Sequence, residues 1–244
     1  MMTRIGIIGR AGRMGEALAA AIAGNDALTL SGGIDLGGDP IALAKASDVL
    51  LDFSSPKALM DNLGGGVAAG TAMVIGTTGL EEHHHQMIDD AARHIAVLQT
   101  GNTSLGVTLL ARLVREAASR LGPEWDIEIV ETHHRHKVDA PSGTAQLLGR
   151  AAAKGRGILL DTNSERGRDG ITGARRVGAI GFASLRGGTV AGDHTVMFAA
   201  DDERIELTHR AENRTIFASG ALKAALWLVG QPAGRFGMDD VLGL

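Results

Sequence analysis

The fold is decided by the stretch RIGIIGRAGRMGEALAAAIAG at residues 4–24. An apolar run at residues 4–8 predicts a short buried strand, residues 9–15 form a glycine-rich turn, and an alanine-rich helix follows until Gly24 ends it. Residues 28–34 predict a second strand, which ends at Asp35. The stretch therefore opens a strand-helix-strand unit with two parallel strands.

The same alternation continues to residue 102. Further apolar segments end in small polar residues: DVLLDFSSP at 48–56, AMVIGTTG at 72–79 and HIAVLQTGN at 94–102. Helices are predicted between them, near residues 57–70 and 81–93. Apolar strands that alternate with helices indicate an α/β fold with a Rossmann-like, doubly wound parallel sheet.

The pattern changes after residue 102. A long helix at 104–121, a strand at 126–132 and a helix at 144–153 precede residues 154–176, a polar stretch expected to be mobile or irregular. Strands follow within 177–188, 189–200 and 203–212, and the turn candidates RGGT and ADDE predict an antiparallel segment. A final helix begins near residue 215 and stops before Gly230. We expect a dinucleotide-binding domain of residues 1–104 and 215–244, and a smaller α+β domain of residues 105–214.

Composition limits the possible functions. The chain has 244 residues with 44% hydrophobic and 21% charged residues, as in ordinary globular proteins, and a net charge of -4, which argues against general nucleic-acid binding. It has no cysteine, which excludes disulfides, thiolate metal ligands and a thiol nucleophile. The sequence shows no signal-peptide pattern and no apolar run near the ~20 residues that cross a bilayer, so we expect a cytoplasmic protein without membrane contact.

The glycine turn has two interpretations. Gly9, Gly12 and Gly15 are spaced GxxGxxG and not GxGxxG, so the turn could be a strand-helix connection without a ligand. It could also hold a pyrophosphate on the amides at the helix start, with Asp35 accepting hydrogen bonds from the adenosine ribose. Leu36 and two glycines follow Asp35, which favours NADH, although Arg10 and Arg13 keep NADPH possible. Asp35 taken alone is also compatible with a solvated turn residue.

The other strand ends predict the rest of a cofactor crevice. Ligands of open α/β sheets lie outside the carboxyl ends of the strands. Three short segments are expected there: Phe53-Ser54-Ser55, Gly76-Thr77-Thr78 and Thr100-Gly101-Asn102. Their small polar side chains and backbone amides suit a nicotinamide carboxamide and its ribose.

The segment ETHHRHK at 131–137 concentrates protonatable groups. A metal site is one interpretation, because His134 and His136 are two positions apart, but no obvious third ligand is nearby. A solvated basic surface is a second interpretation. The third is an anion site in which His133 and Lys137 donate protons.

The residues after this cluster favour the third interpretation. Ser142 is a candidate N-cap, and the amides of Gly143, Thr144 and Ala145 are expected to be unpaired at the helix start and available to a carboxylate or phosphate. Together these groups predict a small substrate with more than one negative charge. The run His83-His84-His85 is expected to be a solvent-facing helix start without a ligand.

With these elements in view, the chain resembles the bacterial dihydrodipicolinate reductases, also called 4-hydroxy-tetrahydrodipicolinate reductases, of the lysine and diaminopimelate pathway. The resemblance runs over nearly the whole length, and its HHRHKVDAPSGTA segment is highly specific to this family. The motifs that carry it are GRAGRMG at 9–15, VIGTTG at 74–79, ETHHRHKVDAPSGTA at 131–145, IGFASLRGG at 180–188, AGDHTVMF at 191–198 and ALWLVGQPAGRFGMDDVLGL at 225–244.

The resemblance implies a reaction and a set of residues. NADH or NADPH would reduce a small cyclic dicarboxylate, 4-hydroxy-tetrahydrodipicolinate, with loss of water, in a homotetramer built by the open mixed sheet of the second domain. By position, His133 and Lys137 would donate protons, and His134, Ser142, Gly143 and Thr144 would bind substrate. Arg214 and Phe217 match residues that close over the cofactor. The other cofactor positions are Gly9, Arg10, Ala11, Gly12, Arg13, Met14, Asp35, Phe53, Gly76, Thr77, Thr78, Thr100, Gly101, Asn102 and Thr103.

The chain departs from the enterobacterial members at cofactor positions. Leu36 replaces an arginine that can meet the NADPH phosphate, Ser55 replaces another arginine, and Thr103 replaces an aromatic residue. The change at Leu36 argues against use of both cofactors, and all three changes alter cofactor contacts while leaving the reaction unchanged. Two other functions stay open: a different nicotinamide-dependent reductase of a small dicarboxylate, and a catalytically silent NAD-binding regulator.

Overall fold

The structure is a computed structural model that describes residues 2–244. It divides the chain into two compact units. The first unit combines residues up to Leu105 with Thr215–Leu244, and the second unit is Gly106–Arg214. The chain therefore leaves the first unit once and returns to it for its last segment.

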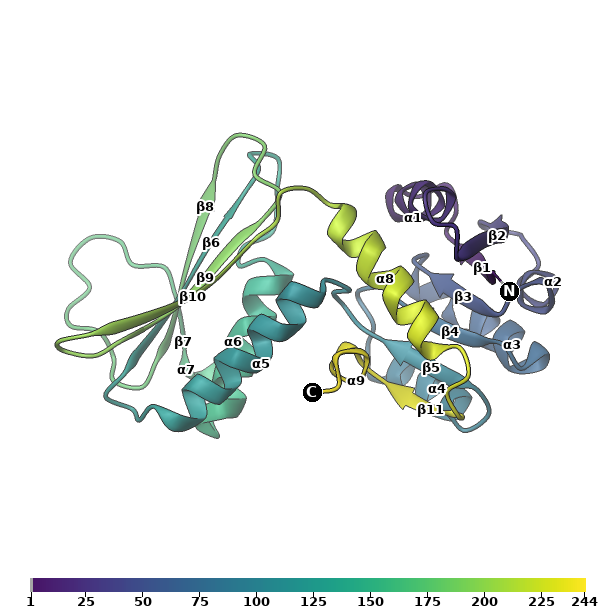
Figure 1. Cartoon of the computed structure of the whole chain (residues 1–244). Helices are drawn as coiled ribbons and strands as arrows, with labels where there is room; N and C mark the ends of the chain where they lie inside the picture. Colours follow the sequence, from purple (N-terminus) through teal and green to yellow (C-terminus); the bar gives the residue numbers. More distant parts are fainter. Residues whose placement is uncertain (1) are drawn as a thin grey trace. The chain divides into compact units, whose positions relative to one another are not determined.

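The first unit contains a six-stranded parallel sheet in the order β11-β5-β4-β3-β1-β2 (Figure 1). Strands β1 and β3 are neighbours while β2 lies outside β1, so the strand order reverses between β1 and β3, the place where such sheets bind ligands. The predicted doubly wound sheet is confirmed. Its strands are β1 (Thr3–Ile8), β2 (Leu28–Ile34), β3 (Val49–Asp52), β4 (Ala72–Ile75), β5 (Ala96–Gln99) and β11 (Gly234–Phe236).

Helices cover both faces of this sheet. On one face α1 (Arg13–Ala23) and α8 (Thr215–Leu228) share a buried cluster with β1, β3 and β5, to which α9 (Met238–Leu242) adds its apolar side chains. On the other face α2 (Pro40–Ala46), α3 (Leu59–Ala69) and α4 (Glu82–Ala92) bury a second cluster. Continuously apolar strands such as Val49–Asp52 are what a sheet covered on both faces requires.

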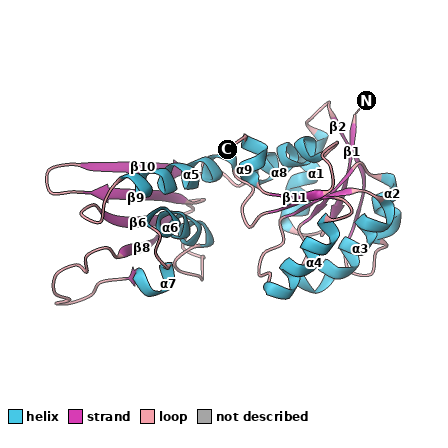
Figure 2. Ribbon diagram, turned by 90° about the horizontal axis from the view of Figure 1, so that it is seen from below, coloured by secondary structure: helices cyan, strands magenta, loops and turns pink. Residues whose placement is uncertain are grey.

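The second unit is built on a five-stranded mixed sheet in the order β10-β9-β6-β8-β7 (Figure 2). The helices α5 (Leu105–Arg120) and α6 (Gly143–Arg156) bury an apolar cluster against one face of it. Strand β6 (Asp126–His133) alternates half-buried and buried residues along its length, so every second side chain points to the helices. The other strands are β7 (Ser164–Arg166), β8 (Ile180–Arg186), β9 (Asp193–Ala199) and β10 (Arg204–Arg210).

Two expectations for the second unit are wrong in part. The ADDE turn does join the antiparallel hairpin β9-β10, but RGGT makes no hairpin, because β6 lies between β8 and β9 and pairs with β8 in parallel. Residues 154–176 are also more ordered than expected, since they contain the end of α6, the short helix α7 (Leu160–Asn163) and β7. Within them Arg175 donates to Asp126 and Glu128 at 2.8 Å each, which fastens this excursion to β6.

Within the described residues 2–244, no helix is both long enough and apolar enough to cross a membrane.

Candidate active site

The glycine turn between β1 and α1 is tight and held by backbone hydrogen bonds. Gly9 has a φ of +84°, and its amide donates to Ile34 O at 2.9 Å, while the Gly12 amide returns to Gly9 O at 3.1 Å. A Cβ at Gly15 would lie 2.3 Å from Gly9 O, so no larger residue fits there. Gly12 is the N-cap of α1 and caps it with no side chain. The turn therefore presents backbone groups at a helix N-terminus, and it fits the pyrophosphate of a dinucleotide.

Asp35 lies directly against this turn. Both of its carboxylate oxygens are 3.1 Å from the amide nitrogen of Ala11, which donates to them. The stem of Arg10 packs over Gly33 of β2, where a Cβ would lie 2.6 Å from Arg10 Cγ. Arg13 and Met14 begin α1, with Met14 partly buried against the core and Arg13 exposed. The residues predicted around the adenosine end are thus brought together in the first unit.

The ends of β3 and β4 are tied together by Asp52, a residue that the sequence analysis missed. Asp52 is fully buried and accepts hydrogen bonds from Ser54 Oγ at 2.6 Å, Asn62 Nδ2 at 2.9 Å and Thr77 Oγ1 at 3.2 Å. The sequence did carry a signal for it: among the described strands of the first sheet, only the apolar strand β3 has an acidic residue as its last residue. This network fixes the two loops that carry the predicted cofactor residues.

The remaining predicted residues of the first unit also lie at strand ends. The Phe53 ring covers Gly76, where a Cβ would be 2.1 Å from it, and Thr78 is exposed beyond. After β5, Thr100 Oγ1 donates to Asn102 O at 2.8 Å, and Gly101 is exposed between them. The buried Thr103 donates from Oγ1 to Phe217 O at 2.7 Å, so the helix that returns from the second unit is fastened to the end of β5.

In the second unit, His133 is the last residue of β6 and is paired with a buried carboxylate. Its Nδ1 makes a short hydrogen bond to Glu131 Oε2. The two side chains are two positions apart on one strand and therefore share the face that packs on the helices. A Cβ at Gly192 would lie 3.0 Å from His133 Nε2, so the absence of a side chain at 192 leaves space beside that nitrogen.

Glu131 is the centre of a network that the sequence analysis did not foresee. Arg186 donates to it in bidentate fashion, from Nη1 to Oε2 at 2.9 Å and from Nη2 to Oε1 at 2.8 Å, and the Ser142 amide donates to Oε1 at 3.3 Å. Burial opposes the ionised form of Glu131, but hydrogen bonds from Arg186, Ser184 and His133 outweigh burial and lower its pKa to about 2. Glu131 is therefore a carboxylate at neutral pH.

A second buried histidine lies next to this network. His194 on β9 is opposite Glu131 in the antiparallel ladder, and its ring meets that of His133 edge-on with centroids 5.0 Å apart. Its Nε2 is 3.1 Å from Ser142 Oγ, while its buried Nδ1 has no hydrogen-bond partner among the described residues. Burial lowers the pKa of His194 to about 4, and the charge of His133 adds to the effect. His194 is thus neutral where Ser142 begins α6.

The residues after His133 form a turn that carries the predicted substrate groups. The Lys137 amide donates to His134 O at 3.1 Å, and the Lys137 ammonium is held by both oxygens of Asp139 at 2.7 and 2.9 Å. Arg214, predicted as a cofactor residue, belongs to the second unit and donates from Nη2 to His134 Nε2 at 2.9 Å. Desolvation and the Arg214 guanidinium lower the pKa of His134. An arginine has only donors, so the Nε2 atom of His134 accepts this hydrogen bond.

The start of α6 has the predicted N-cap, but one of the amides predicted to be unpaired is not. Ser142 is the N-cap, as predicted, and Gly143 is exposed and has no atom within 4 Å of a Cβ position. The Ala145 amide, predicted to be available, donates instead to Ser142 Oγ at 3.2 Å, because the cap satisfies it. An anion at this helix start would meet the first residues, Gly143 and Thr144.

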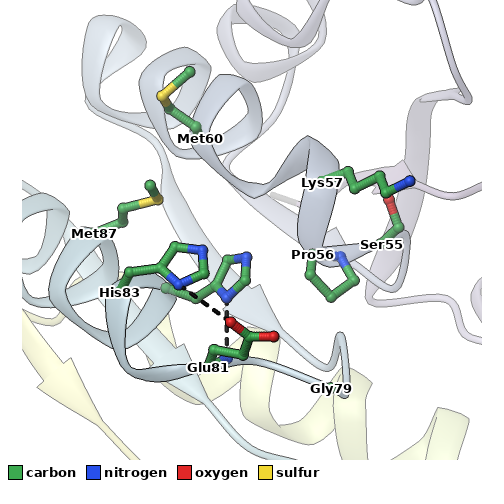
Figure 3. Close-up of a pocket in the computed structure, with 9 residues that line it drawn as sticks. Ser55, Pro56, Lys57, Met60, Gly79, Glu81, His83 and Met87 are labelled. Carbon is green, nitrogen blue, oxygen red and sulfur yellow. Dashed lines mark hydrogen bonds and ion pairs between the residues drawn. The ribbon is translucent and has the colours of Figure 1, made fainter.

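The histidine run at 83–85 differs in part from the solvent-facing helix start that was expected, since His83 is exposed but His84 is not. His84 is buried, and its Nδ1 accepts the Glu81 amide at 3.0 Å, closing a capping box at the start of α4. His83 lies near the Glu81 carboxylate at 3.6 Å (Figure 3). A cavity of about 580 Å3 is lined here by Ser55, Pro56, Lys57, Met60, Gly79, Glu81, His83, His84 and Met87. Within residues 2–244 no group of three His, Asp or Glu side chains is arranged to hold a metal ion.

Comparisons with known proteins cover nearly the whole chain. Two family models match it, "Dihydrodipicolinate reductase, N-terminus" over residues 3–103 and "Dihydrodipicolinate reductase, C-terminus" over residues 106–242. The chain is 58% identical to a 4-hydroxy-tetrahydrodipicolinate reductase of Zymomonas mobilis, covering 99% of this chain and 97% of that protein. It is 52% identical to the protein of the same name from Parvibaculum lavamentivorans, with 99% and 98% covered.

A solved structure shares the fold. The dipicolinate-bound dihydrodipicolinate reductase from Paenisporosarcina sp. TG-14 superposes with a TM-score of 0.80 at 22% sequence identity and covers 98% of this chain and 99% of its own. At that identity the likeness concerns the fold alone.

Proposed function

This chain belongs to the dihydrodipicolinate reductase family, and from that premise we infer that it reduces 4-hydroxy-tetrahydrodipicolinate to tetrahydrodipicolinate with a nicotinamide cofactor. The substrate is a small dicarboxylate. The reduced cofactor supplies a hydride, and the reaction also consumes one proton and releases one water. The protein must therefore bind two carboxylates and deliver a proton to a defined atom.

His133 and Lys137 are the proposed proton donors. The observation that carries this assignment is the buried pair of Glu131 and His133, which leaves His133 Nε2 facing the space beside Gly192. Lys137 supplies a second acid on the turn that follows β6, where Asp139 holds its ammonium. Geometry comes before acidity in identifying a general acid, and these two groups lie on one ordered segment.

The substrate carboxylates are proposed to bind at the start of α6 and on the turn before it. Gly143 and Thr144 would donate from the first turn of the helix, where Ser142 orients the chain as N-cap. His134 would contact a carboxylate from the turn, with Arg214 as its partner and a further positive charge. A rigid helix start and a cation on a separate segment suit two carboxylates that project from one ring.

NADH is the proposed preferred cofactor. The glycine turn and Asp35 would hold the pyrophosphate and the adenosine ribose, and the loops fixed by Asp52 would hold the nicotinamide end. Leu36, which follows Asp35, is fully exposed and supplies no charge for a 2′-phosphate. NADPH binding is then left to Arg10 and Arg13.

The assembly and compartment follow from the same premise. We propose a homotetramer built through the sheet face of the second unit that α5 and α6 leave uncovered, where Leu185 is exposed. We propose that the protein works in the cytoplasm, since its substrate class belongs to amino-acid biosynthesis.

The decisive experiment supplies the substrate enzymatically. Pyruvate and aspartate semialdehyde are converted by the preceding synthase, and the oxidation of NADH and of NADPH is followed separately at 340 nm, the usual wavelength for both. Substrate-dependent oxidation with a higher kcat/KM for NADH is expected. No substrate-dependent oxidation with either cofactor would refute the activity, and a higher kcat/KM for NADPH would refute the preference alone.

A further inference from the structure

A charged residue interrupts the apolar row on the inner face of β6. The buried positions of this strand are Ile127, Ile129, Glu131 and His133. The Glu131 side chain is only 1% exposed, and a carboxylate in such a place costs free energy unless every oxygen is paired. An apolar residue at position 131 would continue the buried series of Ile127 and Ile129. Packing alone therefore does not explain why a glutamate stands there.

We infer that Glu131 is a positioning residue for the reaction, one that fixes the ring orientation and the tautomer of His133. The inference rests on the proposed role of His133 as a proton donor. Glu131 itself is too deeply buried to touch substrate, so it acts through the histidine. The pair has the same logic as a carboxylate that orients a catalytic histidine in other enzymes.

The tautomer follows from the hydrogen bond. An ionised carboxylate only accepts hydrogen bonds, so the nitrogen that faces it, His133 Nδ1, must carry a proton. In the neutral ring Nε2 is then the unprotonated nitrogen, and it is the atom that takes up and releases the second proton. Gly192 keeps this nitrogen accessible, because a side chain at 192 would begin 3.0 Å away from it. The proton that His133 donates is therefore carried by its Nε2 atom.

The carboxylate is itself held from several elements. From β8, Arg186 forms the bidentate pair, and Ser184 adds a hydrogen bond. From α6, the Ser142 amide donates, and from β9, His194 lies opposite. Arg186 Nη2 also donates to Asp139 O at 2.8 Å, on the segment that carries Lys137. The pair of Glu131 and Arg186 therefore connects His133, the start of α6 and the segment that carries Lys137.

The first test measures the tautomer in the unaltered enzyme. Two-dimensional 1H–15N NMR of the histidine rings distinguishes neutral rings protonated on Nδ1 from those protonated on Nε2, and the His133 signal is assigned by its disappearance in His133→Gln. We expect the Nδ1-protonated form for neutral His133. The Nε2-protonated form would overturn the inference, and this measurement needs no variant of Glu131 to fold.

The second test compares two identical substitutions on one strand. Glu131→Gln keeps the side-chain volume but places an amide where the carboxylate faced His133, and we expect kcat to fall about 10²-fold, the low end of what a general acid contributes. KM for the substrate and the Kd for NADH are expected to change far less, because the binding groups remain. The His133 signal should move to the Nε2-protonated form, and Glu131→Asp should recover part of kcat.

Glu128→Gln is the matched control. Glu128 lies on the same strand, on the face opposite to that of Glu131, and pairs with Arg168 and Arg175. It is expected to lose stability without a specific loss of kcat. Equal losses of kcat in both variants would mean that Glu131 acts only through the fold and would overturn the inference. Near-native turnover in His133→Gln would instead refute the proposed donor, whatever the NMR result.

Discussion

Each unit of the molecule has a strand that leads into a helix at its candidate site, and the two connections are built in different ways. The one after β1 contains glycines with backbone hydrogen bonds, and a Cβ at Gly15 would strike Gly9 O. The one after β6 contains ionisable side chains, and the buried pair of Glu131 and His133 precedes it. Both connections end at a helix N-terminus that suits an anion.

In the proposed function, this difference separates cofactor binding from proton transfer. A connection made of backbone holds an anion equally well at any pH near neutrality, because amides do not titrate there. A connection made of histidine, lysine and carboxylates also controls where protons reside. Substitutions after β1 should therefore change affinity or stability, whereas substitutions after β6 should change turnover and the response to pH.

The largest effect is expected at Lys137. Lys137→Ala removes a proposed proton donor and should lower kcat by about 10²- to 10⁴-fold, the range for a general acid, while the Kd for NADH stays near that of the wild type. Steady-state kinetics and NADH fluorescence titration measure the two quantities. Lys154→Ala, at the exposed end of α6, is the control and should retain wild-type turnover. Near-native kcat in Lys137→Ala would remove the contrast between the two connections.

A loss of stability in acid is expected from Glu131. Its folded pKa of about 2 is below the ordinary value of 4.5, so the unfolded chain binds the proton more readily. The stabilisation is full above pH 4.5 and is lost as the pH falls towards 2, and it amounts to about 3 kcal/mol by linkage. Urea unfolding of the wild type and of Glu131→Gln between pH 6 and 3 measures the difference. A difference in unfolding free energy that does not shrink with acid would contradict this prediction.

A steric loss is expected in the glycine turn. In Gly15→Ala the new methyl group would meet two backbone carbonyls, at 2.3 Å from Gly9 O and 2.5 Å from Arg10 O. Overpacking of this kind destabilises proteins by about 1–3 kcal/mol, and NADH affinity should fall with it because the turn must shift. Gly64→Ala is the control, an exposed helical position with no atom within 4 Å, and should be neutral or stabilising. Thermal unfolding and NADH titration check both, and equal behaviour of the two variants would show that the turn tolerates a side chain.

The smallest effect is expected at Asp35. Asp35→Asn replaces the acceptor beside the Ala11 amide by a neutral one. The kcat/KM for NADH should fall about tenfold, which is the value of one hydrogen bond to a charged group, with less change for NADPH. Asp26→Asn, in the exposed loop before β2, should leave both values unchanged. A parallel loss for both cofactors in Asp35→Asn would place the carboxylate away from the ribose.

The fold was predictable because its periodicity is regular. Unbroken apolar strands, a glycine turn and alternating helices identified the doubly wound sheet. The start and the alanine-rich body of α6 were also predicted, whereas its last residues were expected to be irregular. Short elements were missed, since the three residues of β11 and of β7 carry no periodic pattern and gain their structure from neighbouring strands. The order of β8, β6 and β9 was also missed. Pairing between strands that are distant in the sequence depends on tertiary contacts, which local sequence patterns do not specify.

The site was predictable only where a motif carried it. The residues at 133–144 are contiguous, and their spacing suggested donors followed by a helix start. Glu131, Arg186 and His194 lie on three different strands, and only the sheet register brings them together. The sequence did hold one clue, a glutamate at a buried position of the alternating strand DIEIVETH. A charged residue at such a position predicts a partner but does not identify it.

The short strand β11 pairs with β5 and is itself the edge strand on that side of the first sheet. On the ribosome, all five strands of the second sheet emerge before β11 and α8 are synthesised. Until then β5 has an unpaired edge, and the apolar face formed by Leu18 and Ile22 of α1 lacks the α8 side chains that cover it. Open edges and uncovered apolar faces are where nascent chains aggregate. The last thirty residues, from Thr215 to Leu244, therefore determine when the edge of β5 and the apolar face of α1 are covered in the newly made protein.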